Sequence, residues 1–210
     1  MRDPGLTRPQ RFAKRALDLA IALPGLLLSS PVIVLAVLIS TIDTRQWGVF
    51  GQKRVGRHGT TFRVYKVRTM RASPAVTTNV TSTTDPRITR SGRLFRRLKI
   101  DELPQLFNVV RGDMSLIGPR PDVVGFADML EGDDRIVLSV RPGITGPATL
   151  VYRDEESLLA DVGDPETYNA TVIWPHKVQL NRAYVENYRL SDDLRLMAQT
   201  LFHWPHGHQP

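Results

Sequence analysis

An uninterrupted apolar run near the N-terminus constrains this chain more than any other feature. From Leu19 to Ile42 the sequence contains no ionisable residue for 24 positions. As a helix that rises ~1.5 Å per residue, this run is long enough to cross a hydrocarbon layer of ~30 Å. A signal peptide is disfavoured, because the run is long and no A-x-A-like cleavage site closes it. The run therefore predicts a membrane anchor.

The centre of the run and its flanks argue against a plain transmembrane span. Pro31 has no N–H and disfavours a helical Ser30, while the hydroxyls of Ser29 and Ser30 can bind the freed carbonyl oxygens. A re-entrant helix that bends at Ser30-Pro31 and leaves by the same face would keep both basic flanks cytoplasmic, as the positive-inside rule requires. From these residues alone, re-entrant and spanning helices stay equally open. The basic flanks are Arg8, Arg11, Lys14 and Arg15 before the run, and Arg45, Lys53, Arg54 and Arg57 after it.

The charge of the chain indicates a polyanionic partner. Its 210 residues carry a formal net charge of +7, and 41% of them are hydrophobic, which suffices for a real core. Anionic lipid, a nucleotide-linked substrate and nucleic acid all qualify. Nucleic acid is disfavoured, because only 7% of the residues are aromatic and the apolar run would have no purpose. The absence of cysteine excludes disulfides and thiolate metal sites.

Residue patterns predict a hairpin, a loop and a basic helix after the anchor. Residues 48–70 read as short strands around a Gly-containing turn with a basic polar face. Residues 72–86 are rich in Ser and Thr and predict a mobile loop, either an active-site lid or a disordered insertion. Residues 87–99 place apolar side chains on one side and cations elsewhere, which suits a helix on an anionic membrane or one packed on a core.

The C-terminal half reads as mainly helical. Apolar residues at i, i+3, i+4 and i+7 predict an amphipathic helix that begins near Pro104 and ends at Gly112. Residues 154–161 and 165–201 also look helical, with an interruption near Pro175. The fold class is therefore predicted as α+β, mainly helical, with a few short strands. The predicted parts are a membrane segment (1–46), a compact catalytic domain (47–202) and a disordered tail (203–210).

Two adjacent acids, Asp101 and Glu102, stand where the Pro104 helix is expected to begin. The helix dipole favours negative charge there, so we expect both acids to be ionised. Their mutual repulsion requires nearby cations or a divalent metal. One alternative is that Asp101 caps the helix and Glu102 only decorates its first turn. A second guanidinium, Arg120 in the rigid turn "SLIGPRP", is placed to clamp a phosphate and favours a reactive site instead.

Carboxylates, a metal and arginines together would suit phosphoryl transfer, in which an aspartate attacks phosphorus. The sequence contains no Walker-type loop, His-x-x-x-His pair or Ser/His/Asp set. Hydrolase and kinase readings therefore lack their characteristic residues.

At these residues the chain resembles the bacterial sugar transferases, or monotopic phosphoglycosyl transferases, in their short form. The resemblance implies transfer of a sugar 1-phosphate from a UDP-sugar to a polyprenyl phosphate, with release of UMP and a requirement for Mg²⁺. It also implies a monotopic protein on the cytoplasmic face of the bacterial inner membrane, where it starts surface glycan assembly. The segments that carry it are "KRALDLAIALPGLLLSSP", "FGQKRVGRHGTTFRVYKVRTM", "LFRRLKIDELPQLFNVVRGDMSLIGPRP", "VRPGITG" and "AYVENYRLSDDLRLMAQTL".

By resemblance, Asp101 matches the family's nucleophile and Glu102 its partner, both expected near Mg²⁺. Arg96 and Arg120, with Pro121 in the same "PRP" turn, match the phosphate-binding residues.

The membrane motif is matched at Ser30 and Pro31, which correspond to the break of the family's re-entrant helix. The resemblance thus favours the re-entrant reading. Lys14, Arg15 and Asp18 match its "KRxxD" motif, and Lys66 and Arg68 match a basic "K-x-R" strand motif.

Two departures from the family pattern affect the interpretation. A Gln-containing segment often follows "PGITG", whereas "PATLVYRDEESLLA" follows here, so donor contacts in that region are expected to differ. Trp47-Gly48 replaces the usual Gly-Pro. The alternative function is a non-catalytic membrane adaptor that binds anionic lipid or a partner protein, and a homodimer is left open.

Overall fold

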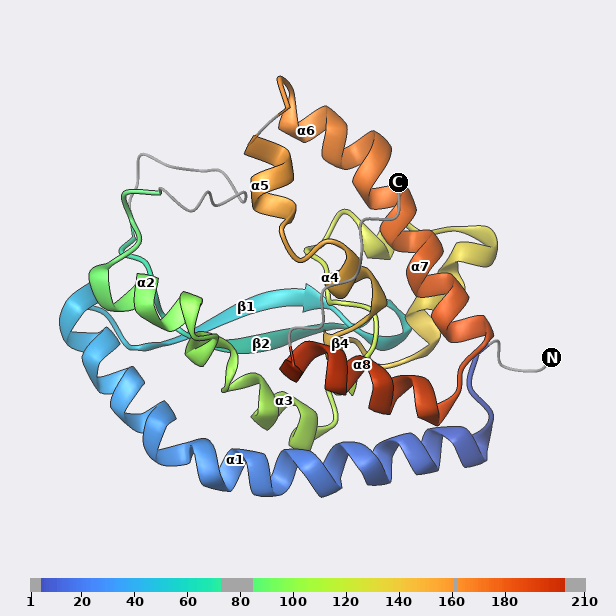
Figure 1. Cartoon of the computed structure of the whole chain (residues 1–210), viewed down its shortest axis with the longest axis horizontal. Coiled ribbons are helices and arrows are strands. Elements are labelled where there is room, and N and C mark those ends of the chain that lie inside the picture. The colour runs from blue at the N-terminus through green and yellow to red at the C-terminus, as the bar shows by residue number, and fades with distance from the viewer. Residues whose placement is uncertain (1–4, 73–84, 161, 203–210) are drawn as a thin grey trace.

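A long helix lies along one edge of a mainly helical body (Figure 1). The computed structural model describes residues 5–72, 85–160 and 162–202. Helix α1 (Arg8–Thr44) forms that edge, and a hairpin of β1 (Val49–Val55) and β2 (Thr61–Val67) lies across the body. Helices α2 (Arg90–Arg97) and α3 (Gln105–Arg111) follow the hairpin. The predicted class, mainly helical with a few short strands, is confirmed.

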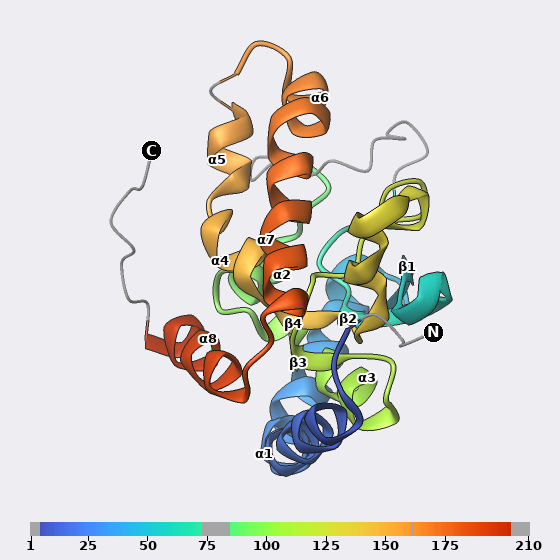
Figure 2. The same ribbon diagram turned by 90° about the vertical axis from the view of Figure 1, so that its right-hand side faces the viewer.

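The remaining elements complete the body. Figure 2 shows α5, α6 and α7 projecting from the region of the strands, while α8 lies beside α1. In chain order the elements are β3 (Ser115–Ile117), β4 (Gly143–Thr145), α4 (Pro147–Val151), α5 (Glu155–Ala160), α6 (Pro165–Tyr168), a π-helical turn (Asn169–Ile173), α7 (Trp174–Glu186) and α8 (Leu190–Phe202).

Helix α1 is a single curved helix that contains both prolines of the apolar run. A capping box between Thr7 and Gln10 starts it. Ser29 Oγ donates to the Gly25 carbonyl at 2.7 Å, and Ser30 Oγ donates to the Leu27 carbonyl at 2.8 Å. These bonds satisfy carbonyls near the prolines. The chain thus bends without leaving the helical conformation, whereas the sequence predicted a break of the re-entrant helix at Ser30-Pro31.

The middle of α1 exposes its apolar side chains. In its most apolar stretch only 11% of the residues are buried, so α1 is not a core helix of an ordinary soluble domain. By length and composition it is the one described helix that could cross a membrane. The exposed side chains include Leu23, Leu27, Leu28, Val32, Val34, Leu35, Leu38, Ile39 and Ile42.

The N-terminal part of α1 is tied to the body by the "KRxxD" residues. Lys14 Nζ forms a buried ion pair with Asp193 of α8 at 2.7 Å. Arg15 donates to the carbonyls of the last turn of α3, Val109 and Val110, where a cation complements the helix dipole. A third contact joins the Asp18 carboxylate to Ser115 Oγ and Leu116 N of β3.

The C-terminal part of α1 is tied to the same body. Ser40 Oγ donates to the Arg68 carbonyl, and Gly48 N donates to Thr41 Oγ1 at 2.9 Å. Ser91 Oγ of α2 donates to the Asp43 carboxylate at 2.5 Å. Both ends of α1 therefore contact one folded unit, and only the middle is without polar contacts to it among the described residues.

The hairpin and the core set the positions of the site elements. Strands β1 and β2 pair antiparallel around a turn in which Gly59 takes φ +78°, as the sequence predicted. The main cluster of buried apolar side chains joins α1, β2, α3, β3 and α7, and it holds these elements around one centre. Its members are Leu6, Ala22, Val64, Val109, Met114, Leu116, Ile117, Val140, Tyr184, Val185 and Tyr188.

One helical prediction needs correction in the C-terminal half. The α-helix is interrupted next to Pro175, as predicted, by a π-helical turn (Asn169–Ile173) that separates α6 from α7. The chain also leaves the helical path between α7 and α8, at residues 187–189, which was not predicted. The predicted loop at 72–86 lies mostly, and the predicted tail at 203–210 entirely, outside the described residues.

Close backbone packing places the turn that carries Arg120. Strands β3 and β4 pair in parallel, and the turn leaves directly from β3. A Cβ atom on Gly143 would clash with the backbone nitrogen of Gly118, so this approach requires glycine.

We expect Gly143→Ala to destabilise the fold by at least about 1–3 kcal/mol, because backbone atoms must move apart. Thermal unfolding measures this loss. Gly163→Ala is the matched control, since no atom of the described residues lies within 4 Å of the added Cβ, and its effect should stay within about 0.5 kcal/mol. Equal melting temperatures for the two variants would contradict the packing argument.

Candidate functional site

The two adjacent acids lie on a 3-10 turn (Ile100–Glu102) between α2 and α3. Lys99 adopts a left-handed conformation, with φ 57°, which ends α2 and redirects the chain into this turn. Helix α3 begins only at Gln105. The acids therefore lie on a turn of their own directly before the helix, whose start near Pro104 was predicted.

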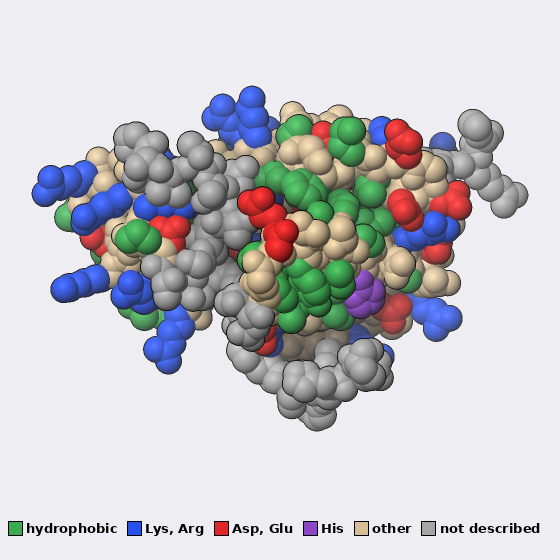
Figure 3. All heavy atoms as spheres, turned by 90° about the horizontal axis from the view of Figure 1, so that it is seen from above, with side chains coloured by type: hydrophobic (Ala, Val, Ile, Leu, Met, Phe, Trp, Pro, Cys, Tyr) green, Lys and Arg blue, Asp and Glu red, His purple; other side chains and the backbone are tan. Residues whose placement is uncertain are grey.

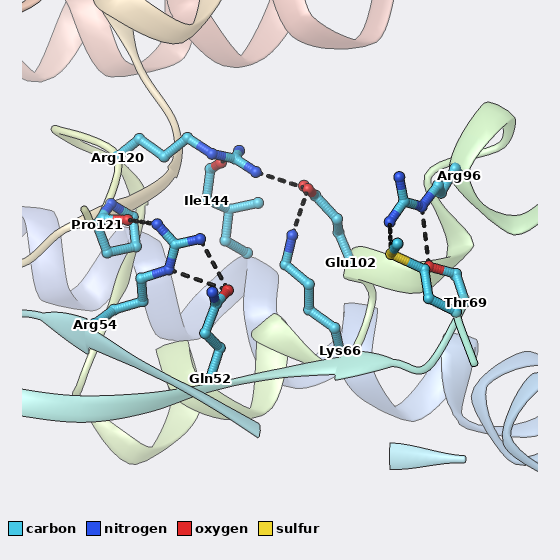
Figure 4. A network of polar contacts seen from close by, with 10 residues as sticks. Gln52, Arg54, Lys66, Thr69, Arg96, Glu102, Arg120, Pro121 and Ile144 are labelled. Atoms are coloured by element: carbon cyan, nitrogen blue, oxygen red, sulfur yellow. Dashed lines mark hydrogen bonds and ion pairs between the residues drawn. The ribbon is translucent and has the colours of Figure 1, made fainter. Parts of the chain in front are cut away.

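Glu102 is the anion on which two cations converge (Figure 4). Its Oε1 accepts from Lys66 Nζ of β2 at 3.1 Å and from Arg120 Nη2 at 2.8 Å. Burial alone would raise the pKa of Glu102, but Arg120 and Lys66 outweigh it and hold that pKa well below its usual range. Glu102 is thus ionised at any physiological pH, as the sequence predicted.

Asp101 differs from its neighbour in its surroundings. It is 8% exposed, and its Oδ1 is buried with no hydrogen-bond partner among the residues that the structure describes. Burial and then the charge of Glu102 raise the pKa of Asp101, while Lys66, Arg96 and Lys99 oppose the shift. Two adjacent carboxylates therefore have different properties: one is neutralised by ion pairs and the other holds a free oxygen.

The two other predicted basic residues occupy different positions. Arg96 Nε donates to Thr69 Oγ1 at 2.9 Å and its Nη2 contacts Met70 Sδ at 2.9 Å, so it acts on Asp101 only through its charge. Arg68 points away, with its Nε on the Trp47 carbonyl at 2.9 Å and its guanidinium over the Phe50 ring. These contacts place Arg68 outside the site.

Two residues that were not selected as site residues from the sequence, Gln52 and Arg54, border the site. Arg54 Nε and Nη2 donate to Gln52 Oε1 at 3.2 and 2.8 Å, and Arg54 Nη1 donates to the Pro121 carbonyl at 3.2 Å. Pro121 thus contributes a backbone oxygen rather than a side chain. The alternation of Gln52 and Arg54 along a strand paired with Lys66 was the available signal for their shared face.

Asp122, which sequence reasoning also missed, is the third acid of this region. Burial raises the pKa of Asp122 to about 6, against the opposing charges of Lys177, Arg54 and Arg120. The folded chain binds the Asp122 proton more tightly than the unfolded chain does. Protonated Asp122 therefore makes its whole contribution to the stability of the fold below pH about 4. This stability is lost as the pH rises through about 6.

We therefore expect Asp122→Asn to gain stability relative to the unmodified chain between pH 4 and pH 8. The gain should reach up to about 3 kcal/mol, because the variant avoids ionising a buried carboxylate and one pKa unit corresponds to about 1.4 kcal/mol. Melting temperatures of both proteins across this pH range provide the measurement. A constant difference at all pH values would show that Asp122 titrates normally.

The acids fit a magnesium ion. No group of three or more His, Asp or Glu side chains among the described residues could hold a metal by itself. Magnesium, however, commonly binds through one or two carboxylates together with waters and substrate phosphates. The unpartnered Oδ1 of Asp101 beside Glu102 meets this requirement.

Comparison with known proteins identifies the family. The family model for bacterial sugar transferases matches residues 9–206. The chain belongs to the bacterial sugar transferase family. This confirms the resemblance carried by the sequence motifs.

Relatives within the family differ in length. The UDP-N-acetylgalactosamine-undecaprenyl-phosphate N-acetylgalactosaminephosphotransferase of Aeromonas hydrophila is 34% identical over 194 residues, covering 90% of this chain and 43% of the relative. The undecaprenyl-phosphate glucose phosphotransferase of Komagataeibacter xylinus is 44% identical over 175 residues, covering 77% and 33%. The uncharacterized sugar transferase EpsL of Bacillus subtilis is 33% identical over 188 residues, covering 90% and 85%. The chain thus spans less than half of the first two relatives.

Proposed function

We propose that this protein transfers a sugar 1-phosphate from a UDP-sugar to a polyprenyl phosphate through a phospho-aspartyl intermediate. The observation that carries the proposal is the buried Asp101, whose Oδ1 has no hydrogen-bond partner in the described part of the chain and lies beside a carboxylate neutralised by two cations. The names of relatives, which include phosphotransferases acting with undecaprenyl phosphate, support the same reaction class.

In the first step an Asp101 carboxylate oxygen attacks the β-phosphorus of the UDP-sugar. An oxygen–phosphorus bond forms, the bond from the β-phosphorus to the bridging oxygen breaks, and UMP leaves with the electron pair. In the second step an oxygen of polyprenyl phosphate attacks the same phosphorus. The bond to Asp101 breaks and the carboxylate is restored.

The neighbouring side chains have complementary roles in these steps. Arg120 and Lys66 hold Glu102 and add positive charge where phosphate oxygens gain negative charge. The charge of Arg96 favours the ionised form of Asp101, which is the nucleophilic form. Asp101 and Glu102 would hold Mg²⁺, which would neutralise phosphate oxygens when bound.

We propose that α1 is re-entrant in the cytoplasmic leaflet of the bacterial inner membrane. Both ends of α1 bind one folded unit, through Lys14 and Asp18 at one end and Ser40 and Asp43 at the other. A helix that spanned the bilayer would separate its ends by the ~30 Å hydrocarbon layer and expose one of them on the opposite side. The exposed apolar middle of α1 would instead enter the lipid and return.

The basic helix α2 suits the membrane surface. Leu94 and Leu98 are 51% and 57% exposed, while Phe95 packs into the body. Lysine and arginine side chains gather at the end of the molecule that holds α2 (Figure 3). Exposed leucines beside cations fit an anionic lipid interface, which would bring the site to the level of the carrier phosphate.

The test is UMP release by purified protein with UDP-sugars, with and without undecaprenyl phosphate in nanodiscs. We expect sustained release only when both substrates are present. The rival adaptor function predicts no release with any sugar, together with unchanged thermal stability on addition of UDP-sugars.

A further inference from the structure

Arg54 presents a guanidinium that neutral groups hold beside the acid site. Its three hydrogen bonds go to the side-chain oxygen of Gln52 and the backbone oxygen of Pro121. Among the described residues it forms no ion pair, unlike Arg120, which binds Glu102 at 2.8 Å. The bonds orient the guanidinium without neutralising its charge.

The hairpin directs Arg54 toward the site. Gln52 pairs with Val64 and Phe50 pairs with Lys66, so Gln52, Arg54 and Lys66 share one face of the two strands. Figure 4 shows Arg54 and Arg120 on the same side of Glu102, opposite Arg96. Lys53, the next residue along β1, points to the other face and is exposed.

Arg54 and Arg120 lie close enough to repel each other. Burial is the main cause that lowers the pKa of Arg54, and the charge of Arg120 lowers it further, against Asp122 and Glu102. Two guanidinium groups in proximity are stabilised when an anion binds between them. The diphosphate of a nucleotide sugar offers one negatively charged phosphate group to Arg54 and one to Arg120.

We propose that Arg54, oriented by Gln52, binds the nucleotide phosphate of the donor, which departs as UMP. This rests on the proposed function and adds a residue to it. Asp101 and Glu102 mark the phosphorus that reacts, and Arg120 already joins that centre through Glu102. Arg54 lies farther from the acids than Arg120 does. It contacts the other phosphate of the diphosphate, the one that leaves in UMP, and stabilises the negative charge that UMP carries away.

The test measures UMP binding by isothermal titration calorimetry to the full chain in detergent. We expect Arg54→Met to weaken UMP binding about tenfold or more, the loss expected for a hydrogen bond to a charged group. Lys53→Met is the matched control, because it removes a cation from the same strand on the opposite face, and it should bind UMP normally.

Two further variants separate positioning from charge. Arg54→Lys keeps the charge but loses the planar donors, so its affinity should fall between those of the unmodified chain and Arg54→Met. Gln52→Ala should weaken UMP binding as well, because Arg54 is then free to move, and it should leave the KM for undecaprenyl phosphate unchanged. Melting temperatures confirm that each variant is folded.

The inference is overturned if folded Arg54→Met binds UMP as tightly as Lys53→Met, or if only the KM for undecaprenyl phosphate changes. It is also overturned if folded Arg54→Lys behaves as the unmodified chain while Gln52→Ala has no effect. The proposed function fails separately if the unmodified protein binds UMP but transfers no phosphosugar. An unmodified protein that does not bind UMP refutes both.

Discussion

Asp101→Asn should abolish phosphosugar transfer, with a fall in rate of at least about 10⁴-fold, because an amide cannot form the acyl-phosphate bond. The substitution keeps the size of the side chain and removes a charge that is already costly to bury. The fold should therefore be unharmed or slightly stabilised. UMP release in the presence of undecaprenyl phosphate gives the rate, and UMP affinity shows whether the donor site is intact.

Glu131→Gln is the control for this prediction, since it replaces an exposed acid and should leave the rate unchanged. A residual rate above about one tenth in Asp101→Asn would show that another group attacks the phosphorus. Glu102 would not be the first substitute, because Lys66 and Arg120 occupy its Oε1 and weaken it as a nucleophile.

Lys14→Met should destabilise the protein by about 3–5 kcal/mol, because it leaves the buried Asp193 without a counterion. Asp193 is 1% exposed and accepts hydrogen bonds from Tyr184 at 2.6 Å and Tyr188 at 3.0 Å. These hydroxyls bind the carboxylate but cannot neutralise it. For a chain of this length the loss corresponds to roughly 6–20 °C in melting temperature.

Two comparisons make this prediction specific. Arg8→Met removes an exposed cation from the same helix and should change the melting temperature little. The double variant with Asp193→Leu should recover part of the loss, because it no longer buries an unpaired charge. If Lys14→Met and Arg8→Met had the same melting temperature, the ion pair between Lys14 and Asp193 would not anchor α1 to α8.

Local patterns sufficed to predict several elements of this fold. The hairpin follows from β-forming residues around a glycine turn, and the end of α3 follows from Gly112, which takes φ 98°. The serine hydroxyl bonds near Pro31 were foreseen, but the sequence did not show whether they would keep α1 continuous or leave a break. The short parallel pair of β3 and β4 depends on contacts between distant glycines that no periodicity reveals.

The sequence predicted only part of the site, again because some of its contacts join residues that are distant in the chain. Asp101 and Glu102 are adjacent in sequence, and the rigid turn indicated Arg120. The motif resemblance added Lys66, and both cations contact Glu102. Arg54 was missed, because its bond to the Pro121 carbonyl joins residues 67 positions apart. Its local signals were the strand alternation that it shares with Gln52 and its place in a segment that carries the family resemblance.

The central claim is that Asp101 receives the phosphosugar before the lipid acceptor binds, and trapping this adduct tests it most directly. The protein would be incubated with UDP-sugar labelled at the β-phosphate, without polyprenyl phosphate, then quenched and digested for mass spectrometry. We predict one equivalent of label on Asp101, an equal burst of UMP, and loss of the label when undecaprenyl phosphate is added. Label on another residue, or no UMP release until the acceptor is present, would contradict the account.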